Sequence, residues 1–317
     1  MKRRLTPIVF AALLASSALH ADAPAKLPQV WRNAPQLTSA DKAPVIAATN
    51  AGRRVVAVGD YGVVIFSDDG KSFRQAKVPT RAVLTSVFFI NDKRGWIAGH
   101  DGTVLSTADG GENWHVLREE QGKDRVLLSI WFADEGHGIA VGQFGLALFT
   151  EDGGVTWQER RLVDGEIGEK HLMHIFAGGG QVFVVAEAGA LFRSDDGGRS
   201  WKGQQTDNRG SFWTGMVMAD GGIVVAGMRG HIYRSDDRGA TWKEVPSGTQ
   251  QSFTAIAQRA DGSVRLVGNA GTDLYSKNQG RTFEARNHAD RANLTAMAMG
   301  EKRNVLFTLA GVAAEEK

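Results

Sequence analysis

A short motif that recurs at nearly constant spacing constrains the fold of this chain more than any other feature. The pattern Ser/Thr-x-Asp-x-Gly-x-x-Trp occurs four times, as TADGGENW (107–114), TEDGGVTW (150–157), SDDGGRSW (194–201) and SDDRGATW (235–242). Two weaker copies are FSDDGKSF (66–73) and SKNQGRTF (276–283). The shared glycines, at 70, 111, 154, 198, 239 and 280, are 41 to 44 residues apart. A fixed period in this range is typical of a propeller or a solenoid.

Six copies of one motif indicate a structural corner, because a reaction centre needs only one constellation of residues. The Asp carboxylate can accept hydrogen bonds from N–H groups of a tight turn, and Gly can adopt a positive φ. The Trp can anchor the turn through a large buried surface. We therefore assign a structural role to the acid positions and to the four tryptophans: Asp68, Asp109, Asp152, Asp196, Asp237, Asn278, Trp114, Trp157, Trp201 and Trp242. The motif is identified as the BNR repeat, or Asp-box.

Each repeat reads as four short strands, for example LTSVFFI (84–90), GWIAGH (95–100), GTVLST (102–107) and WHVLRE (114–119). Four strands per repeat of this length form one blade of a β-propeller. Seven segments have the pattern of a first strand: 45–48, 84–90, 127–132, 172–176, 212–218, 253–257 and 294–299. The sequence therefore predicts an all-β, seven-bladed propeller with four-stranded blades.

The last repeat stops before its box, so its fourth strand has to come from elsewhere. The segment VWRNAPQLTSADKAPVIA (30–47) aligns with TWKEVPSGTQQSFTAIA (241–257), and this alignment puts Trp31 at the position of a box tryptophan. We expect the N-terminal strand to complete the last blade and to close the ring.

The N-terminus has the layout of a secretory signal peptide. Three bases at positions 2–4 precede an apolar run over residues 8–19, which is too short to span a membrane, and small residues follow. We expect cleavage after Ala21, a short linker over 22–27 and a propeller over 28–317. A secreted chain without disulfides suits a bacterial periplasm, where we expect the mature protein.

The composition narrows the function classes further. The absence of cysteine excludes disulfides, thiolate metal sites and a cysteine nucleophile. The net charge is +2, and removal of residues 1–21 leaves −1, which argues against nucleic acid as a partner. No later segment is apolar over a length that could span a membrane.

Candidate binding residues lie in the loops opposite the boxes, where blades differ in chemistry. From the turns between second and third strands we select Asp60, Tyr61, His100, Asp101, Phe144, Glu187 and Arg229. Six blades also carry a base shortly before the first strand: Lys42, Arg81, Arg125, Lys170, Arg209 and Arg291. These bases could form a ring that docks carboxylates. The other interpretation is a solvated rim with local ion pairs, because acids such as Asp124 and Glu169 are interleaved.

Enzymatic interpretations find less support. Sialidases share the box, but their early Phe/Tyr-Arg-Ile-Pro motif is absent. The segment HLMH (171–174) falls on an expected strand, where residues three apart point to opposite faces, so it does not predict a metal site. We expect no catalytic residues and no cofactor, with a glycan-binding or glycoside hydrolase propeller as the alternative.

From about residue 28 onward the chain resembles the photosystem II stability/assembly factor family of BNR propellers. The resemblance rests on the signal peptide, the seven repeats, boxes such as STADGGENW and RSDDRGATW, and the box-less last repeat. It implies a non-enzymatic assembly factor that docks a membrane-protein subunit through an arginine-rich surface. In a non-photosynthetic host we expect a periplasmic scaffold for an envelope complex, such as a resistance-nodulation-division transporter.

Overall fold

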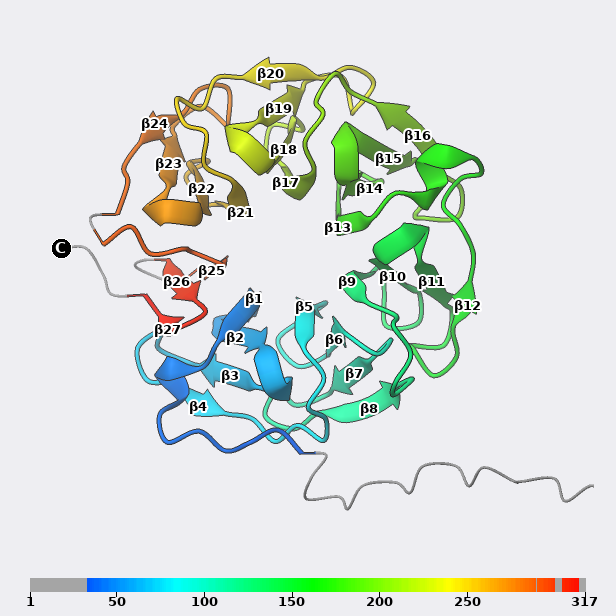
Figure 1. The fold of residues 1–317 in the computed structure, drawn as a ribbon, viewed down its shortest axis with the longest axis vertical. Helices are drawn as coiled ribbons and strands as arrows, with labels where there is room; N and C mark the ends of the chain where they lie inside the picture. Colours follow the sequence, from blue (N-terminus) through cyan, green and yellow to red (C-terminus); the bar gives the residue numbers. More distant parts are fainter. Residues whose placement is uncertain (1–32, 289, 300–303, 314–317) are drawn as a thin grey trace, which may run out of the picture.

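The computed structural model describes residues 33–288, 290–299 and 304–313, and it is a seven-bladed β-propeller. Seven antiparallel sheets stand around a central axis in chain order (Figure 1). Six sheets have four strands each, and the seventh has three. The helices in the described part are 3-10 turns of three or four residues, and none of them has the length to cross a membrane.

The strands repeat the same radial order in every blade, as Figure 1 shows. The innermost strands are β1 (Val45–Ala51), β5 (Leu84–Phe89), β9 (Leu127–Phe132), β13 (Leu172–Gly178), β17 (Phe212–Val217), β21 (Phe253–Gln258) and β25 (Ala296–Ala298). The second strands are β2 (Arg54–Gly59), β6 (Gly95–Gly99), β10 (Gly138–Gly142), β14 (Gln181–Ala186), β18 (Ile223–Gly227), β22 (Val264–Gly268) and β26 (Val305–Thr308).

The third strands are β3 (Val64–Ser67), β7 (Val104–Thr107), β11 (Ala147–Thr150), β15 (Ala190–Ser194), β19 (Ile232–Ser235), β23 (Asp273–Ser276) and β27 (Gly311–Val312). The outermost strands are β4 (Arg74–Gln75), β8 (His115–Arg118), β12 (Gln158–Glu159), β16 (Lys202–Gln205), β20 (Lys243–Val245) and β24 (Glu284–Ala285). The seven first strands predicted from sequence are thus confirmed as the innermost ones.

The second strands form the centre of the core. Every residue of β6, β10, β14 and β18 is buried, because neighbouring blades cover both faces of each sheet. Such strands lose the alternation of apolar and polar residues and become nearly continuous apolar runs. This explains the segments WIAG, IAVG, VFVVA and IVVAG in the sequence.

The ring closes through its innermost strands. A hydroxyl from one first strand bonds to the next first strand, as where Thr85 Oγ1 donates to Leu127 O at 2.6 Å. The same contact joins the two ends of the chain, where Thr295 Oγ1 donates to Val45 O at 2.7 Å. The side chain of Asn50 also exchanges two hydrogen bonds with the backbone of Met299.

The N-terminal segment does not complete the last blade in the way that we expected. Trp31 lies outside the described residues, and residues 33–37 follow the first blade, along the outer side of β4 (Figure 1). Ala34 N–H donates to Val78 O at 3.0 Å, and the Gln75 amide bonds both Pro35 O and Leu37 N–H. The Gln75 side chain thereby fixes this segment to the first blade, and the seventh sheet keeps three strands.

The box corners are confirmed as hydrogen-bonded turns. In the fourth blade, Asp196 accepts bonds from the Ser194 hydroxyl, the Ser200 N–H and the Ser200 hydroxyl at 2.6–2.9 Å. Asn278 makes the same set with Ser276 and Thr282, since its amide nitrogen can donate to the Thr282 hydroxyl.

The acid of the first box is Asp69, so the assignment of Asp68 was wrong. This box is one residue shorter than the others, and Asp69 accepts bonds from the Ser67 hydroxyl and from the N–H groups of Lys71 and Ser72. Asp68 instead forms ion pairs with Arg54 and Arg74. The leading hydroxyl is therefore present, one position later than the alignment on Gly70 placed it.

The aromatic residue that ends each box lies in the apolar cluster between its own blade and the preceding one. Trp201, for example, packs with Ile139 and Val141 of the third blade. The six aromatic residues in this role are Phe73, Trp114, Trp157, Trp201, Trp242 and Phe283. Each box thus fixes two blades relative to one another.

The boxes predict how stability depends on pH. Hydrogen bonds from the Thr241 hydroxyl and N–H lower the pKa of Asp237 to about 2, and Thr156 does the same for Asp152. Because the folded pKa lies below the unfolded value, these carboxylates stabilise the fold above about pH 4, and the effect is lost as the pH falls toward 2. We expect the double variant Asp152→Asn/Asp237→Asn to show a shallower fall of the urea midpoint between pH 4 and pH 2.5. Equal slopes for variant and wild type would contradict this.

Candidate functional site

The turns between second and third strands share one backbone geometry and form the face opposite the boxes, called here the turn face. The second residue of six of these turns has a positive φ of 53–56° although it is not glycine: Tyr61, Asp101, Phe144, Ala188, Arg229 and Ala270. This left-handed conformation costs a non-glycine residue about 1–2 kcal/mol. The same conformation recurs in six blades because the glycine that follows this residue lies close to the segment that connects the blade to the next one.

The close approach is visible at Gly62 and Gly145. A Cβ on Gly62 would lie 2.1 Å from Thr80 O, and one on Gly145 would lie 1.9 Å from Gly168 O. Both carbonyls belong to the connection that leads into the next blade. The turn therefore presses against that connection, and the second turn residue is left on the outside, where its side chain faces solvent.

Large apolar side chains are exposed on this face. The described part contains five exposed large apolar residues, and three of them lie in these turns: Tyr61 at 59%, Phe144 at 67% and Leu309 at 62%. Solvent-exposed aromatics with no role in the fold are typical of protein-binding surfaces.

The bases that precede the first strands fall into two groups. Three of them are ion-paired locally: Lys42 with Asp41 at 4.0 Å, Lys170 with Glu166 at 3.6 Å, and Arg125 with both Glu120 and Glu159. The others, together with the turn residue Arg229, are exposed and have no carboxylate partner among the described residues: Arg81, Arg209, Arg229 and Arg291. The second group is electrostatically available to a partner.

One cluster joins candidates from the third and fourth blades. The ring of Phe144 packs edge-on against that of His171, with centroids 4.5 Å apart. Phe144 N–H donates to His171 Nδ1 at 3.0 Å, so the neutral ring carries its proton on Nε2, which lies 3.8 Å from Glu187 Oε2. Arg161 Nη1 donates to Phe144 O. A cavity of about 490 Å³ lies beside this cluster, bordered by Arg125 and Phe144.

Sequence reasoning missed His171 and Arg161. We considered His171 only as a metal ligand paired with His174, whereas it directly precedes β13, in the same connection as Lys170. The spacing that selected the bases could have found it. Arg161 follows the short strand β12 and has no counterpart in the motif analysis.

The remaining turn candidates are not brought together. Asp60 accepts the N–H of Tyr61 at 2.7 Å, which is a bond within its own turn. His100 and Asp101 form backbone hydrogen bonds, to Val83 and Glu120 respectively. Asp60 lies on the first blade and His100 and Asp101 lie on the second, and they border no common cavity among those that the structure shows.

No group of three or more His, Asp or Glu side chains in the described ranges could hold a metal ion. A two-carboxylate hydrolase needs one acid with a raised pKa. Where a carboxyl pKa in the described part is shifted, it is lowered: burial opposes the shift, but hydrogen bonds from hydroxyl, guanidinium and backbone groups outweigh it, as at Asp109, Glu120 and Asp220.

Comparison with known proteins points to one family. A family model described as "Photosynthesis system II assembly factor YCF48" matches residues 65–241, more than half of the chain. Two curated proteins named photosystem II assembly protein Ycf48 are 38% and 31% identical over 134 residues, from Synechococcus sp. strains JA-3-3Ab and JA-2-3B'a(2-13). The aligned part covers 42% of this chain and 40% of each relative.

Solved structures agree in fold. One described as "YCF48 bound to D1 peptide" has a TM-score of 0.69 at 20% identity and covers 88% of this chain and 94% of its own. "YCF48 from Cyanidioschyzon merolae" gives 0.67 at 16% identity, with coverage of 89% and 96%. The WD40 propeller domain of Doa1 gives 0.68 at 12% identity, with 90% and 96%. Since a WD40 domain matches equally well, the structural likeness establishes the fold alone.

The turn geometry predicts opposite effects for two substitutions. Gly62→Ala adds a Cβ against the Thr80 carbonyl at a positive φ, so we expect a loss of at least about 1–2 kcal/mol of unfolding free energy. Ala270→Gly relieves the same backbone strain at the cost of chain entropy, so we expect a change between zero and about 1 kcal/mol of stabilisation. Urea unfolding of both variants checks this. Destabilisation by Ala270→Gly to the same extent as by Gly62→Ala would contradict it.

Proposed function

The chain belongs to the photosystem II assembly factor Ycf48 family, and from that premise we propose that it is a non-catalytic docking protein for a segment of a membrane protein. A propeller of this fold in the same family has been solved with a peptide, described as D1. In this chain we assign the docking role to the turn face.

The observation that carries this assignment is the combination of exposed aromatic and unpaired cationic side chains on one face. Tyr61 and Phe144 are more than half exposed, and Arg209 and Arg229 have no carboxylate partner among the described residues. Aromatic residues and arginine supply most of the binding energy in protein interfaces. Arginine also matches carboxylates through two parallel hydrogen bonds, which favours an acidic segment as the ligand.

We further propose that the protein acts in the periplasm after removal of residues 1–21. The basic and then apolar order of the N-terminal residues supports this location. In a host without photosystem II, the partner would be an envelope complex, for which a resistance-nodulation-division transporter is our hypothesis. The family name would then describe a shared way of binding rather than a shared partner.

Catalysis is not part of the proposal. The carboxyl groups of the boxes have lowered pKa values because they accept the hydrogen bonds that stabilise the box turns, as Asp196 does. The acids of the turn face, Asp60, Asp101 and Glu187, lie in three different blades. Glycan binding remains the alternative, because aromatic side chains such as Tyr61 and Phe144 can also stack on sugars.

Charge reversal on the turn face tests the proposal. We expect the wild-type protein to capture a membrane protein from detergent-solubilised envelopes of its host, and Arg209→Glu/Arg229→Glu to reduce the capture at least about tenfold. Identification by mass spectrometry and titration of the purified partner provide the measurement.

The matched control is Arg199→Glu/Lys202→Glu, which reverses two exposed charges at the box of the fourth blade, on the opposite face. This control should bind like the wild type. Equal loss in both double variants would show a general effect of charge, and capture that survives both reversals would refute docking by the turn face. Binding of glycans without any protein partner would favour the alternative.

A further inference from the structure

The gap between the sixth and seventh blades differs from the other six gaps of the ring. Each of those contains a box aromatic, but the described part of the seventh blade has no box. The apolar cluster in this gap is small and has no aromatic member: its buried residues are Ala257, Val267, Leu294, Met297 and Leu306. A cavity of about 780 Å³ opens beside it.

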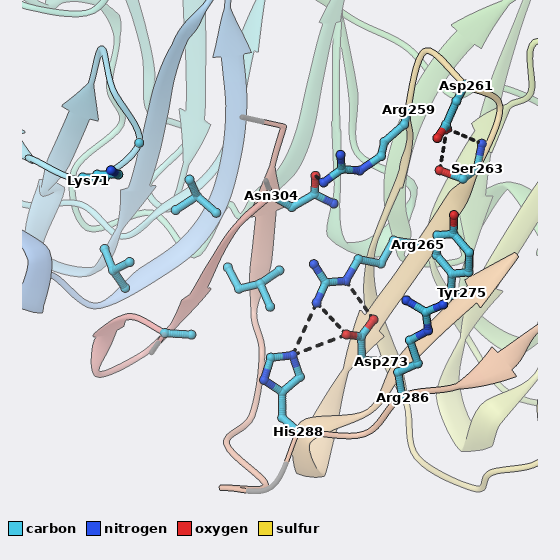
Figure 2. Close-up of a pocket in the computed structure, with 15 residues that line it drawn as sticks. Lys71, Arg259, Asp261, Ser263, Arg265, Asp273, Tyr275, Arg286, His288 and Asn304 are labelled. Atoms are coloured by element: carbon cyan, nitrogen blue, oxygen red, sulfur yellow. Dashed lines mark hydrogen bonds and ion pairs between the residues drawn. The ribbon is translucent and has the colours of Figure 1, made fainter. Parts of the chain in front are cut away.

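The cavity surrounds the outer edge of the seventh blade (Figure 2). Leu306 and Ala313 border it on the side of the sixth blade, and Val305 and Val312 on the side of the first blade. Lys71, from the box of the first blade, lies at the far wall (Figure 2). The cavity therefore occupies the place that an outermost strand fills in the other six blades.

The sheet edge at this place is open. No strand pairs with the outer side of β27 in the part of the chain that the structure describes. Ala313 N–H donates to Leu306 O at 2.9 Å, so by alternation the N–H and C=O groups of Val312 point away from β26. An open edge of this kind can accept an extended peptide as an additional strand.

The cavity wall carries more positive side chains than its own carboxylates can pair. Arg265 pairs with Asp273 at 2.5 Å, so this arginine is neutralised. Arg259 donates to the Asn304 side chain at 3.1 Å. It also lies close to Asp261, whose pKa is lowered by hydrogen bonds from Ser263 and by the charge of Arg259, so these two charges partly compensate each other.

Arg286 and Lys71 add two further positive charges. The guanidinium of Arg286 lies over the ring of Tyr275, 4.3 Å from its centroid, and the residue is exposed (Figure 2). Among the described residues, neither Arg286 nor Lys71 has a carboxylate partner. Arg286 and Lys71 are thus two cations available to an anionic ligand.

We propose that this cavity binds an extended acidic segment of a partner protein. The segment adds a fourth strand to the seventh blade through the edge of β27. One of its aromatic side chains fills the gap that Trp or Phe fills elsewhere in the ring, and its carboxylates pair with Arg286 and Lys71. The site shares no residue with the turn face, so it does not rest on the docking function proposed above.

Residues 33–37, in the described part of the chain before the first blade, do not occupy this cavity. The first blade holds this segment through hydrogen bonds to Leu37, Pro35 and Ala34. Going from Leu37 back to Ala34, the chain moves away from the place where the ring closes. Asn33 O then accepts from Arg81 of the second blade. The described segment therefore leads away from the cavity, which favours a partner supplied in trans.

Selection from a random twelve-residue peptide library displayed on phage, with the purified protein as bait, tests the proposal. We expect the selected peptides to be rich in Asp and Glu and to contain Trp or Phe. The best of them, synthesised with a fluorescein label, should bind less tightly at high salt. Arg286→Glu should weaken it about tenfold, as should Val312→Pro, which removes the outward N–H of the edge.

Arg160→Glu is the matched control. Arg160 has the same position after its box, and its guanidinium lies over Phe149, 3.8 Å from the ring centroid, but its gap is filled by Trp201. It should bind the peptide like the wild type, and circular dichroism should show all variants folded. Peptides without acidic residues, or binding within about twofold of wild type in both Arg286→Glu and Val312→Pro, would overturn the proposal.

Two further variants test whether the chain's own N-terminal segment or the turn face, rather than a partner in this cavity, explains the binding. Tighter peptide binding by Trp31→Ala than by the wild type would assign the gap to the chain's own N-terminal segment and refute the partner. Arg209→Glu/Arg229→Glu should keep the peptide affinity, so that failure at the turn face and failure at this cavity are distinguishable.

Discussion

The propeller depends on one contact that is repeated around the ring: an aromatic side chain held by a box corner in the gap to the preceding blade. The box supplies rigidity, because its acid accepts bonds from a hydroxyl and from successive N–H groups. The indole also reaches back to its own corner, as Trp201 Nε1 donates to Gly198 O at 3.0 Å. Large apolar area and fixed orientation are thereby combined in one residue of each of the six blades that have a box.

The box corners, which hold the blades together, lie on one face of the ring, and the turns whose side chains differ between blades lie on the other. The corners of the boxes need the same residues in each blade, whereas the turn face requires only a glycine at the position that contacts the next connection. The preceding residue is held in the left-handed region in all six turns whether it is Tyr61, Phe144 or Ala188. The backbone conformation is therefore the same whichever of these side chains is present, and residues of different chemistry are displayed at the same position.

The sequence allowed the blade number, the strand order and the inner strands to be predicted, because these follow from a period and from apolar patterning. The acid of the first box was predicted at the wrong position, because the alignment on Gly70 does not show that one residue is missing between the acid and the glycine. The hydrogen bond from Ser67 to Asp69 shows it. The sequence could not distinguish the paired Arg125 from the unpaired Arg209, because ion pairs join residues such as Glu159 that lie far along the chain. The path of residues 33–37 could not be predicted from the sequence either, because it depends on hydrogen bonds to a single side chain, Gln75.

The seventh blade shows which part of a blade the ring requires. Closure is made by inner strands, through Thr295 with Val45 and Asn50 with Met299, and these contacts do not involve an outermost strand. A missing outer strand therefore leaves the ring closed and exposes only a local edge and one unfilled gap. In three of the other blades the outer strand is only two residues long and adds few backbone bonds, and the box aromatic packs in the apolar cluster beside it. A ligand that replaced this strand would place a side chain in the gap between the blades, and the strand pairing would set its direction.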